Sequence, residues 1–280
     1  MNHNLTSKEI SDEIIYGCIT HLPIRIDYPE FIKPIYLGDS CALGELNMNE
    51  LAPNWVKYHP IIGGLVGSFA LKNYINNYKK NQKFVGICQY RKFLSHIKLG
   101  ITADNYKVMD ITSNDKLDKK NLTLTMIPEK IRPLFCQPGQ FFHNGKNYNI
   151  LYQYKDVHHI EDLLRFTAQL IQRKIIDKEE AYSFLTEEIF MPGGIELGIF
   201  PIDFWISNIE KLEEVVLDCI SMFPDKREGY QARAWAFCME RIGSFLLMKE
   251  FRKEPNWIEK YCGFLNLIND DNSNSYTPGI

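Results

Sequence analysis

The chain has 280 residues, of which 45% are hydrophobic and 24% charged, a composition that suits a globular protein with a sizeable core. Its formal net charge of −3 does not favour a nucleic-acid partner, because nucleic-acid binding usually relies on a basic face. The seven cysteines are scattered and include no CxxC pair, so neither a zinc site nor a disulfide framework is indicated.

The first ninety residues alternate between strand and helix patterns. The apolar runs 14–19 and 84–88 are typical of buried strands, and a brief strand is expected at 35–37. Residues 63–78 follow a glycine-rich turn and carry apolar side chains at helical spacing, which predicts a helix. Strands that alternate with helices favour an α/β sheet.

The middle of the chain is more polar. We expect residues 104–130 to form a solvated loop or sheet edge that contains a short strand at 122–127, and a further strand at 148–152. The apolar spacing then predicts one short strand at 197–200 and helices at 160–176, 178–186, 201–223 and 233–251. The sequence therefore predicts a single α/β domain at 1–265 with a helical C-terminal portion, followed by a polar, disordered tail at 266–280.

The N-terminal residues MNHNLTSKEISDE are polar, and the longest apolar runs are shorter than a membrane span. We therefore expect a cytoplasmic protein whose contact with the inner membrane is at most peripheral.

Several polar residues directly follow predicted strands. Thr20 and His21 follow the first strand, Gly38 the second, and Tyr90 and Arg91 the third. Ligands of α/β sheets bind beyond the carboxyl ends of the strands, so we expect these residues near one crevice. An arginine there can hold a diphosphate, because guanidinium binds phosphate oxygens with two parallel hydrogen bonds. A solvated loop is the alternative.

A second group of candidates lies on the predicted helices. His158 and His159 precede Asp162 at a helix start, where the carboxylate can orient an imidazole as a base or a ligand. The alternative is a capping aspartate beside an exposed histidine. Glu240 and Arg241 lie in the last helix, where they could also form a structural ion pair. No Asp-x-Asp occurs, so the sequence assigns no ligand for Mg²⁺ or Mn²⁺, although a divalent metal stays open as a cofactor.

These motifs occur in an order that carries a family resemblance. Thr20-His21 ends the first strand, a Pro-Ile-x-x-Gly strand follows at 34–38, and Lys72-Asn73 lies in the first long helix. The most specific segment is GICQYRKFL at 86–94, which is similar to the pattern Gly-Leu-x-His-Tyr-Arg-Arg-Tyr-Phe. The segments HHIEDL at 158–163, Gly-Tyr at 229–230 and Glu-Arg at 240–241 follow. In all of them the chain resembles an uncharacterised domain family of bacterial capsule and lipopolysaccharide loci that is treated as glycosyltransferases.

The resemblance implies a single Rossmann-like nucleotide-diphosphosugar transferase fold (GT-A-like). It implies a hexosyltransferase-type enzyme that moves a sugar from a nucleotide-sugar donor to a glycan or lipid-linked glycan acceptor in surface polysaccharide synthesis. Under this interpretation the donor-binding residues are Thr20, His21, Gly38, Tyr90, Arg91 and Arg241, and the catalytic residues are Asp162, His159 and Glu240, with Asp162 the better base.

Departures from the family pattern keep other functions open. Gln89 replaces its histidine, Lys92 its second arginine and Leu22 its lysine, which fits a divergent subfamily or an inactive copy. The alternatives are a phosphotransferase that modifies surface glycans and a non-catalytic carbohydrate-binding or scaffold subunit of a polysaccharide assembly complex.

Overall fold

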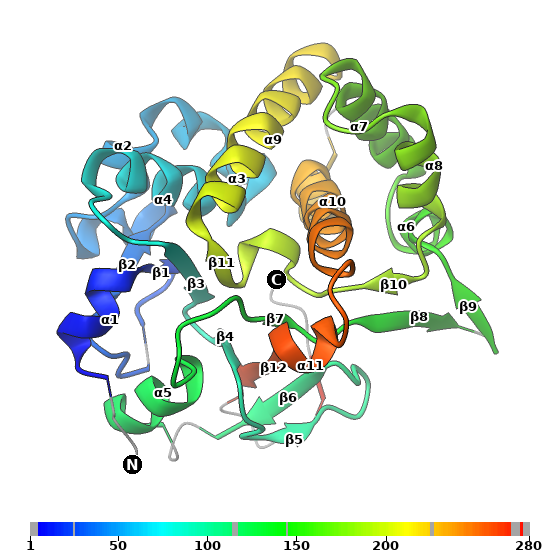
Figure 1. The fold of residues 1–280 in the computed structure, drawn as a ribbon. Helices are drawn as coiled ribbons and strands as arrows, with labels where there is room; N and C mark the ends of the chain where they lie inside the picture. The colour runs from blue at the N-terminus through cyan, green and yellow to red at the C-terminus, as the bar shows by residue number, and fades with distance from the viewer. Residues whose placement is uncertain are drawn as a thin grey trace.

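One large mixed sheet organises the chain (Figure 1). The computed structural model describes residues 5–24, 26–113, 117–143, 145–224, 227–269 and 275–276. In these residues nine strands form the sheet in the order β2-β1-β3-β4-β12-β6-β5, with β11 beside β3 and β7 beside β12. The strands are β1 (Ile14–Thr20), β2 (Ile32–Tyr36), β3 (Phe84–Gln89), β4 (Lys92–Ser95), β5 (Ile101–Thr102), β6 (Met109–Thr112), β7 (Phe135–Cys136), β11 (Gly198–Pro201) and β12 (Cys262–Ile268).

The strand directions bring several carboxyl ends to one edge of the sheet. β1 runs parallel to β2 and β3, and β12 runs parallel to β6. β4 is antiparallel to both β3 and β12, so these two strands point the same way. The chain segments that leave β1, β2, β3, β6 and β12 therefore begin at the same edge, where α/β proteins bind their ligands.

The two faces of the sheet bury separate hydrophobic clusters. In β1, the side chains of Tyr16 and Cys18 belong to one cluster and that of Ile19 to the other, as the alternation of a strand requires. In β3, Val85 and Ile87 pack with Ile19, and Cys88 packs with Tyr16. Apolar residues on both faces explain why these strands read as continuous hydrophobic runs.

Helices and a small second sheet complete the fold (Figure 1). The small sheet has the order β10-β8-β9 and consists of β8 (Gly139–His143), β9 (Lys146–Tyr148) and β10 (Ile189–Phe190). The helices are α1 (Ser7–Glu13), α2 (Met48–Leu51), α3 (His59–Ile62), α4 (Leu65–Tyr78), α5 (Lys119–Met126), α6 (Ile150–Val157), α7 (Ile160–Gln172), α8 (Lys178–Thr186), α9 (Ile202–Met222), α10 (Ala234–Phe251) and α11 (Trp257–Tyr261). Short 3-10 turns include η1 (Gly38–Leu43), η4 (Gly194–Glu196) and η5 (Gly229–Arg233).

The mixed α/β class is confirmed, as are the strands and helices that had strong periodicity. The expected helix at 178–186 matches α8, which begins with a capping box between Asp177 and Glu180. The helices expected at 63–78, 160–176, 201–223 and 233–251 match α4, α7, α9 and α10 within a few residues at each end. The strands expected at 14–19, 35–37, 84–88 and 197–200 correspond to β1, β2, β3 and β11.

Two expected strands are wrong because polar side chains start helices there. Residues 122–127 lie mainly in α5, whose N-cap Asp118 accepts a hydrogen bond from the Asn121 amide at 2.7 Å. Residues 148–152 straddle the start of α6, where Asn149 accepts from the Tyr152 amide at 2.9 Å. The expected solvated loop at 104–130 also contains β6, in which Met109 is buried.

The C-terminal portion is not only helical. β12 lies between β4 and β6 in the middle of the sheet, so the expected domain boundary at 265 falls inside a strand. Its central Asn266 is buried and bonds Ser95 Oγ at 2.7 Å and Thr112 Oγ1 at 2.9 Å. This buried polar residue interrupts the apolar pattern by which a strand is recognised. Of the expected tail, residues 270–274 and 277–280 lie outside the described residues.

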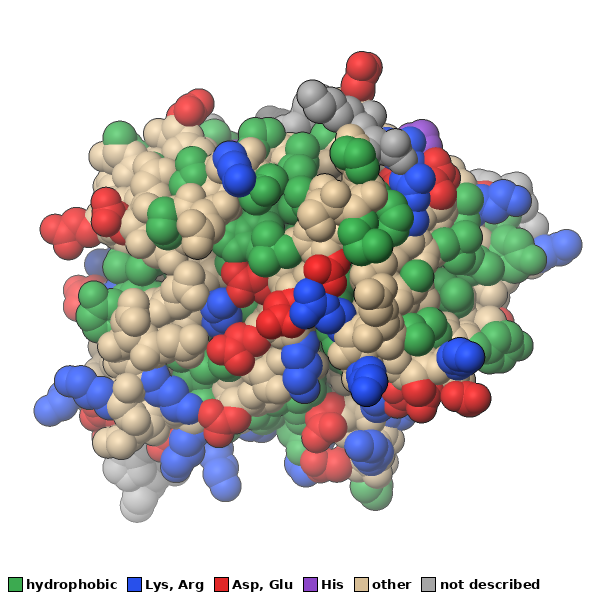
Figure 2. All heavy atoms as spheres, turned by 90° about the horizontal axis from the view of Figure 1, so that it is seen from above, with side chains coloured by type: hydrophobic (Ala, Val, Ile, Leu, Met, Phe, Trp, Pro, Cys, Tyr) green, Lys and Arg blue, Asp and Glu red, His purple; other side chains and the backbone are tan. Residues whose placement is uncertain are grey.

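Charges of both signs are intermixed on the face seen from above in Figure 2. Near the end of α7, Arg173 pairs with Asp218 at 2.6 Å and with Glu214 at 2.5 Å, both on α9. Within the described chain, no helix combines the length and the apolar character that a membrane crossing requires.

Candidate functional site

The turn between β3 and β4 joins the ends of several strands. The Tyr90 amide donates to the Ile19 carbonyl at 3.3 Å, and the Ile268 amide donates to the Arg91 carbonyl at 2.9 Å. These bonds connect Tyr90 and Arg91 to the carboxyl-terminal ends of β1 and β12. The ring of His21, just after β1, meets the Tyr90 ring edge-on with centroids 5.0 Å apart. The expected proximity of His21, Tyr90 and Arg91 is thus observed.

Two glycines with positive φ allow two more basic side chains to approach. Gly38 follows β2 with φ of +58°, and a Cβ there would lie 2.9 Å from His59 Cε1. Gly63 has φ of +52°, and a Cβ there would lie 2.9 Å from Arg233 Cδ. Each position needs glycine both for its backbone conformation and for this contact. We call His21, His59, Arg91 and Arg233 the basic cluster.

The basic cluster has the electrostatics of an anion site. Partial desolvation lowers the pKa of His21, and the nearby His59, Arg233 and Arg91 lower it further. In the part of the chain that the structure describes, no carboxylate pairs with Arg91 or Arg233. Burial lowers the pKa of His59, although the nearby Asp39 opposes this shift. Arg91 and Arg233, two fixed positive charges without a carboxylate partner at the carboxyl edge of a sheet, are suited to an anionic ligand.

A cavity of about 700 Å³ adjoins the basic cluster, and we call it the main cavity. Tyr230 lines it, and the guanidinium of Arg233 lies 4.7 Å from the centroid of that ring. The main cavity is lined by Gln89 and Lys92 of the sheet, Tyr106, Met109, Phe141, Gln153, Val157, His158, Phe190, Pro192, Gly193, Leu197, Tyr230, Phe237, Glu240, Arg241, Leu265 and Tyr276. It combines aromatic walls with a few polar groups, as small-molecule sites do.

Glu240 presents a carboxylate to the main cavity. Its Oε1 accepts a hydrogen bond from the Gly193 amide at 2.8 Å, which holds the side chain against the loop before η4. At the end of η4, Glu196 Oε1 is buried and has no hydrogen-bond partner among the described residues. Burial, with Glu240 nearby, raises the pKa of Glu196 to about 8. Glu196 is therefore a neutral acid at pH 7, close to a second carboxyl group.

Arg241 lies in the wall of the main cavity but is already engaged. Its Nη2 and Nε donate to Gln153 Oε1 at 2.7 and 3.2 Å, and its Nη1 donates to the Phe237 carbonyl at 2.8 Å. The guanidinium also lies 4.9 Å from the ring centroid of Tyr154, and the residue is 5% exposed. The guanidinium of Arg241 is therefore held by protein acceptors, which distinguishes it from Arg91 and Arg233 of the basic cluster.

The C-terminal segment contributes one side of the main cavity. The side chain of Asn105 forms two hydrogen bonds with the backbone of Tyr276: it accepts from the amide at 2.7 Å and donates to the carbonyl at 2.8 Å. The Tyr276 ring stacks on Tyr106 at 5.5 Å, and its hydroxyl accepts from Lys92 Nζ at 3.3 Å. A residue expected in the polar tail thus contacts a cation of the site.

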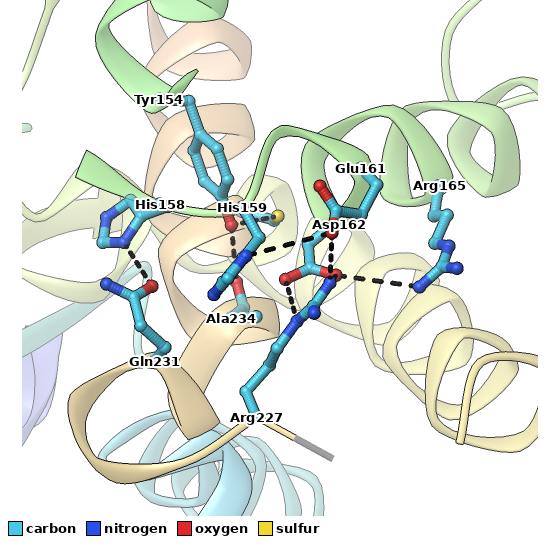
Figure 3. A network of polar contacts seen from close by, with 10 residues as sticks. Tyr154, His158, His159, Glu161, Asp162, Arg165, Arg227, Gln231 and Ala234 are labelled. Carbon is cyan, nitrogen blue, oxygen red and sulfur yellow. Dashed lines mark hydrogen bonds and ion pairs between the residues drawn. The ribbon is translucent and has the colours of Figure 1, made fainter. Parts of the chain in front are cut away.

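Asp162 and His159 do not line the main cavity. Both belong to a network of polar contacts with Glu161 and Arg227 (Figure 3). Asp162 is 3% exposed and accepts from Arg227 Nη2 at 3.0 Å and Nε at 3.2 Å. His159 points outward, with its Nδ1 3.9 Å from Glu161 Oε1. The structure therefore surrounds the two with an ion-pair network and separates them from Glu240.

The neighbouring His158 lines the main cavity instead. It follows the last residue of α6, and its ring stacks on Phe237 with centroids 4.2 Å apart. Its Nδ1 lies 3.0 Å from Gln231 Oε1 (Figure 3). Burial, together with Arg241, lowers the pKa of His158 to about 4, so the ring is neutral at pH 7. The adjacent histidines differ in their surroundings because both lie in the short connection between α6 and α7, where His158 caps the end of the first helix and His159 precedes the second.

Some of the expected donor-binding residues shape the backbone. Thr20 Oγ1 bonds the Leu22 carbonyl and accepts from the Leu22 amide at 3.2 Å, so its hydroxyl closes the turn after β1. Sequence reasoning did not find His59 or Gln153, which belong to no motif. Among the described residues, no group of three or more His, Cys, Asp or Glu side chains is arranged to hold a metal ion.

Comparison with known proteins identifies a shared fold. No family model matches the sequence, and no curated protein sequence matches it either. Among solved structures, the apo structure of the WbbM bifunctional glycosyltransferase is similar, with a TM-score of 0.69 and 13% sequence identity. The match covers 96% of this chain and 47% of that one, so this chain spans about half the length of that protein. At this identity the likeness shows the fold alone.

Proposed function

We propose that this chain is a glycosyltransferase with a GT-A-like nucleotide-diphosphosugar fold. The observation that carries the proposal is the basic cluster, in which Arg91 and Arg233 have no carboxylate partner among the described residues, beside a cavity that contains the carboxylate of Glu240. The fold that it shares with a solved glycosyltransferase supports the same function. The substrates proposed are a hexose-type sugar nucleotide and a glycan or lipid-linked glycan acceptor of bacterial surface polysaccharide. Such an acceptor would be met in the cytoplasm, at the inner membrane, through a peripheral contact.

The basic cluster binds the diphosphate of the donor. Arg91 is the best-placed residue, because it lies in the β3–β4 turn and its backbone is fixed by β12. The side chain of Arg233 reaches the cluster past Gly63. Charge develops on the diphosphate as the sugar leaves, and fixed cations stabilise that charge most in the transition state.

Glu240 acts as the base for the acceptor. The acceptor oxygen forms a bond to the anomeric carbon while the bond from that carbon to the diphosphate oxygen breaks. The hydroxyl proton passes to Glu240, and the nucleoside diphosphate departs with the electron pair. A positioned base contributes on the order of 10²–10⁴-fold to such a step. His158, neutral and in the same cavity, can hydrogen-bond a sugar hydroxyl.

Binding and transfer measurements test the proposal. Thermal shift and calorimetry against UDP-, GDP- and dTDP-sugars, with EDTA or with Mn²⁺, are expected to find one nucleotide that binds in both conditions. Incubation of that donor with bacterial surface glycans should then increase the acceptor mass by one sugar.

Other results would overturn the proposal. Folded protein that binds none of these nucleotides excludes a nucleotide-sugar enzyme. Nucleotide binding without transfer to any glycan fits a non-catalytic subunit, and an acceptor that gains a phosphate fits a phosphotransferase. Donor affinity that is lost in EDTA and returns with Mn²⁺ would reveal a metal site that the described residues do not suggest.

A further inference from the structure

A second hollow opens beside the main cavity. It has a volume of about 400 Å³, and we call it the outer groove. It is lined by Phe141, Phe142, Tyr148, Gln153, Asp156 and Val157. Phe141, Gln153 and Val157 also line the main cavity, so the two hollows share a wall and adjoin each other.

Aromatic rings follow this wall from the main cavity to the surface. Phe190 lines the main cavity and stacks on Phe141 with ring centroids 5.1 Å apart. Phe141 is the cross-strand partner of Tyr148 in the hairpin of β8 and β9, and the next residue, Phe142, is 69% exposed. Tyr152, 56% exposed, lies 6.4 Å from the ring of Tyr148. A series of aromatic rings exposed beside a cavity is typical of a binding surface.

Polar groups suited to hydroxyls accompany the rings. Gln153 uses its Oε1 to hold Arg241, and among the described residues its amide nitrogen makes no hydrogen bond. The carboxylate of Asp156, an exposed residue of the groove, is an acceptor. Planar donors and acceptors beside aromatic faces match a sugar, whose C–H face is apolar and whose edge carries hydroxyls.

We propose that the outer groove binds the second sugar of an oligosaccharide acceptor whose terminal sugar occupies the main cavity. This inference rests on the proposed function. It adds that the site recognises an acceptor of at least two sugars. The continuity of the groove with the cavity of Glu240 favours a glycan chain over a protein partner. A glycan can thread from one hollow into the other, whereas a protein surface would cover the groove from outside.

The test uses an array of neutral bacterial surface oligosaccharides of increasing length together with methyl hexosides, in the presence of the nucleotide that binds. Wild-type protein is expected to retain oligosaccharides more tightly than methyl hexosides. Phe142→Ala should bind oligosaccharides roughly tenfold more weakly, the loss expected for one ring contact, with hexoside and nucleotide affinities unchanged. Phe142→Trp should restore the affinity. Tyr182→Ala removes a ring that is 71% exposed on α8 and lines neither hollow, so it serves as the matched control.

The outcomes separate the inference from the function on which it rests. Failure of the wild type to bind any nucleotide defeats the proposed function. Normal nucleotide binding with no preference for oligosaccharides, or with Phe142→Ala equal to the wild type, overturns the outer groove as an acceptor site. A wild-type dimer that Phe142→Ala converts to a monomer in size-exclusion chromatography also overturns it, since the groove would then be an interface between copies.

Discussion

Arg227 donates two hydrogen bonds to Asp162, from Nη2 at 3.0 Å and from Nε at 3.2 Å, although the residues are 65 positions apart (Figure 3). Asp162 lies in the first turn of α7, and Arg227 precedes η5, which carries Tyr230 and Arg233. The pair thus fastens the segment that brings Arg233 to the basic cluster. The carboxylate of Asp162, which the sequence suggested as a base, is therefore engaged in a contact that stabilises the fold.

Asp162→Ala should reduce the stability of the protein more than its transfer activity. The substitution leaves the half-buried Arg227 without its main counter-charge. We expect this loss to lower the free energy of unfolding by roughly 2–3 kcal/mol. Nucleotide affinity of the folded protein should change little. Thermal melts and calorimetry on the same sample measure both quantities. Asp203→Ala, which removes a side chain that is 90% exposed, is the control and should leave the melting temperature almost unchanged. A stable Asp162→Ala protein without transfer activity would instead restore Asp162 as a base.

Arg91→Ala should weaken nucleotide binding and spare the fold. Its guanidinium has no carboxylate partner among the described residues, so little stability depends on it. Loss of a charged hydrogen bond to the diphosphate costs about 1.5–3 kcal/mol, a tenfold to hundredfold drop in affinity. Arg91→Lys should recover part of this, since a point charge makes no two-pronged contact. Arg173→Ala, outside the main cavity, controls for loss of one positive charge. Unchanged nucleotide affinity in a destabilised Arg91→Ala protein would contradict the assignment.

Glu240→Gln should separate binding from turnover. The amide oxygen of glutamine can still accept from the Gly193 amide, so the loop before η4 should stay in place. Transfer should fall on the order of 10²–10⁴-fold, because glutamine cannot take a proton. Calorimetry with the donor nucleotide and a transfer assay under saturating donor test the two parts. Wild-type turnover by Glu240→Gln would exclude Glu240 as the base.

Glu196→Gln should change the alkaline side of the stability profile. The pKa of Glu196 is raised to about 8 in the folded state and is near 4.5 when unfolded, so the folded protein binds the extra proton between these values. Stability from this group is complete below pH 4.5 and is lost as pH rises through 8. Glutamine mimics the neutral acid at every pH, so the melting temperature of the variant should exceed that of the wild type increasingly from pH 6 to pH 9. Parallel melting curves across this range would contradict the assigned proton.

His158→Gln should change the stability of the protein at acidic pH. The pKa of His158 is lowered to about 4 in the folded state against 6.5 when unfolded, so here the unfolded chain binds more protons between these values. This contribution to stability is present above pH 6.5 and is lost as pH falls through 4. The wild type should therefore lose more melting temperature than the variant between pH 7 and pH 4.5. NMR titration of the His158 ring provides an independent check, and an ordinary midpoint near 6.5 would count against the burial of this side chain in the cavity wall.

The sequence by itself determined the elements whose pattern is local. The apolar runs of β1 and β3 and the helical spacing of α7 and α10 are recognisable because each residue's burial follows from its own position in a strand or helix. It also determined that His21, Tyr90 and Arg91 would lie together, since the carboxyl ends of parallel strands share one edge. Short elements such as α5 were missed because a single capping side chain decided between helix and strand.

Only the tertiary structure decided which polar residues share the site. His59 and Arg233 reach the basic cluster through two glycine contacts, and no spacing in the sequence encodes these contacts. The turn after α6 decided that His158 faces the cavity, and the partner 65 positions away decided that Asp162 is held in an ion pair. Side-chain chemistry names the residues that can act, but burial and long-range partners determine which of them are free to do so, because these depend on chain segments that meet only in the folded protein.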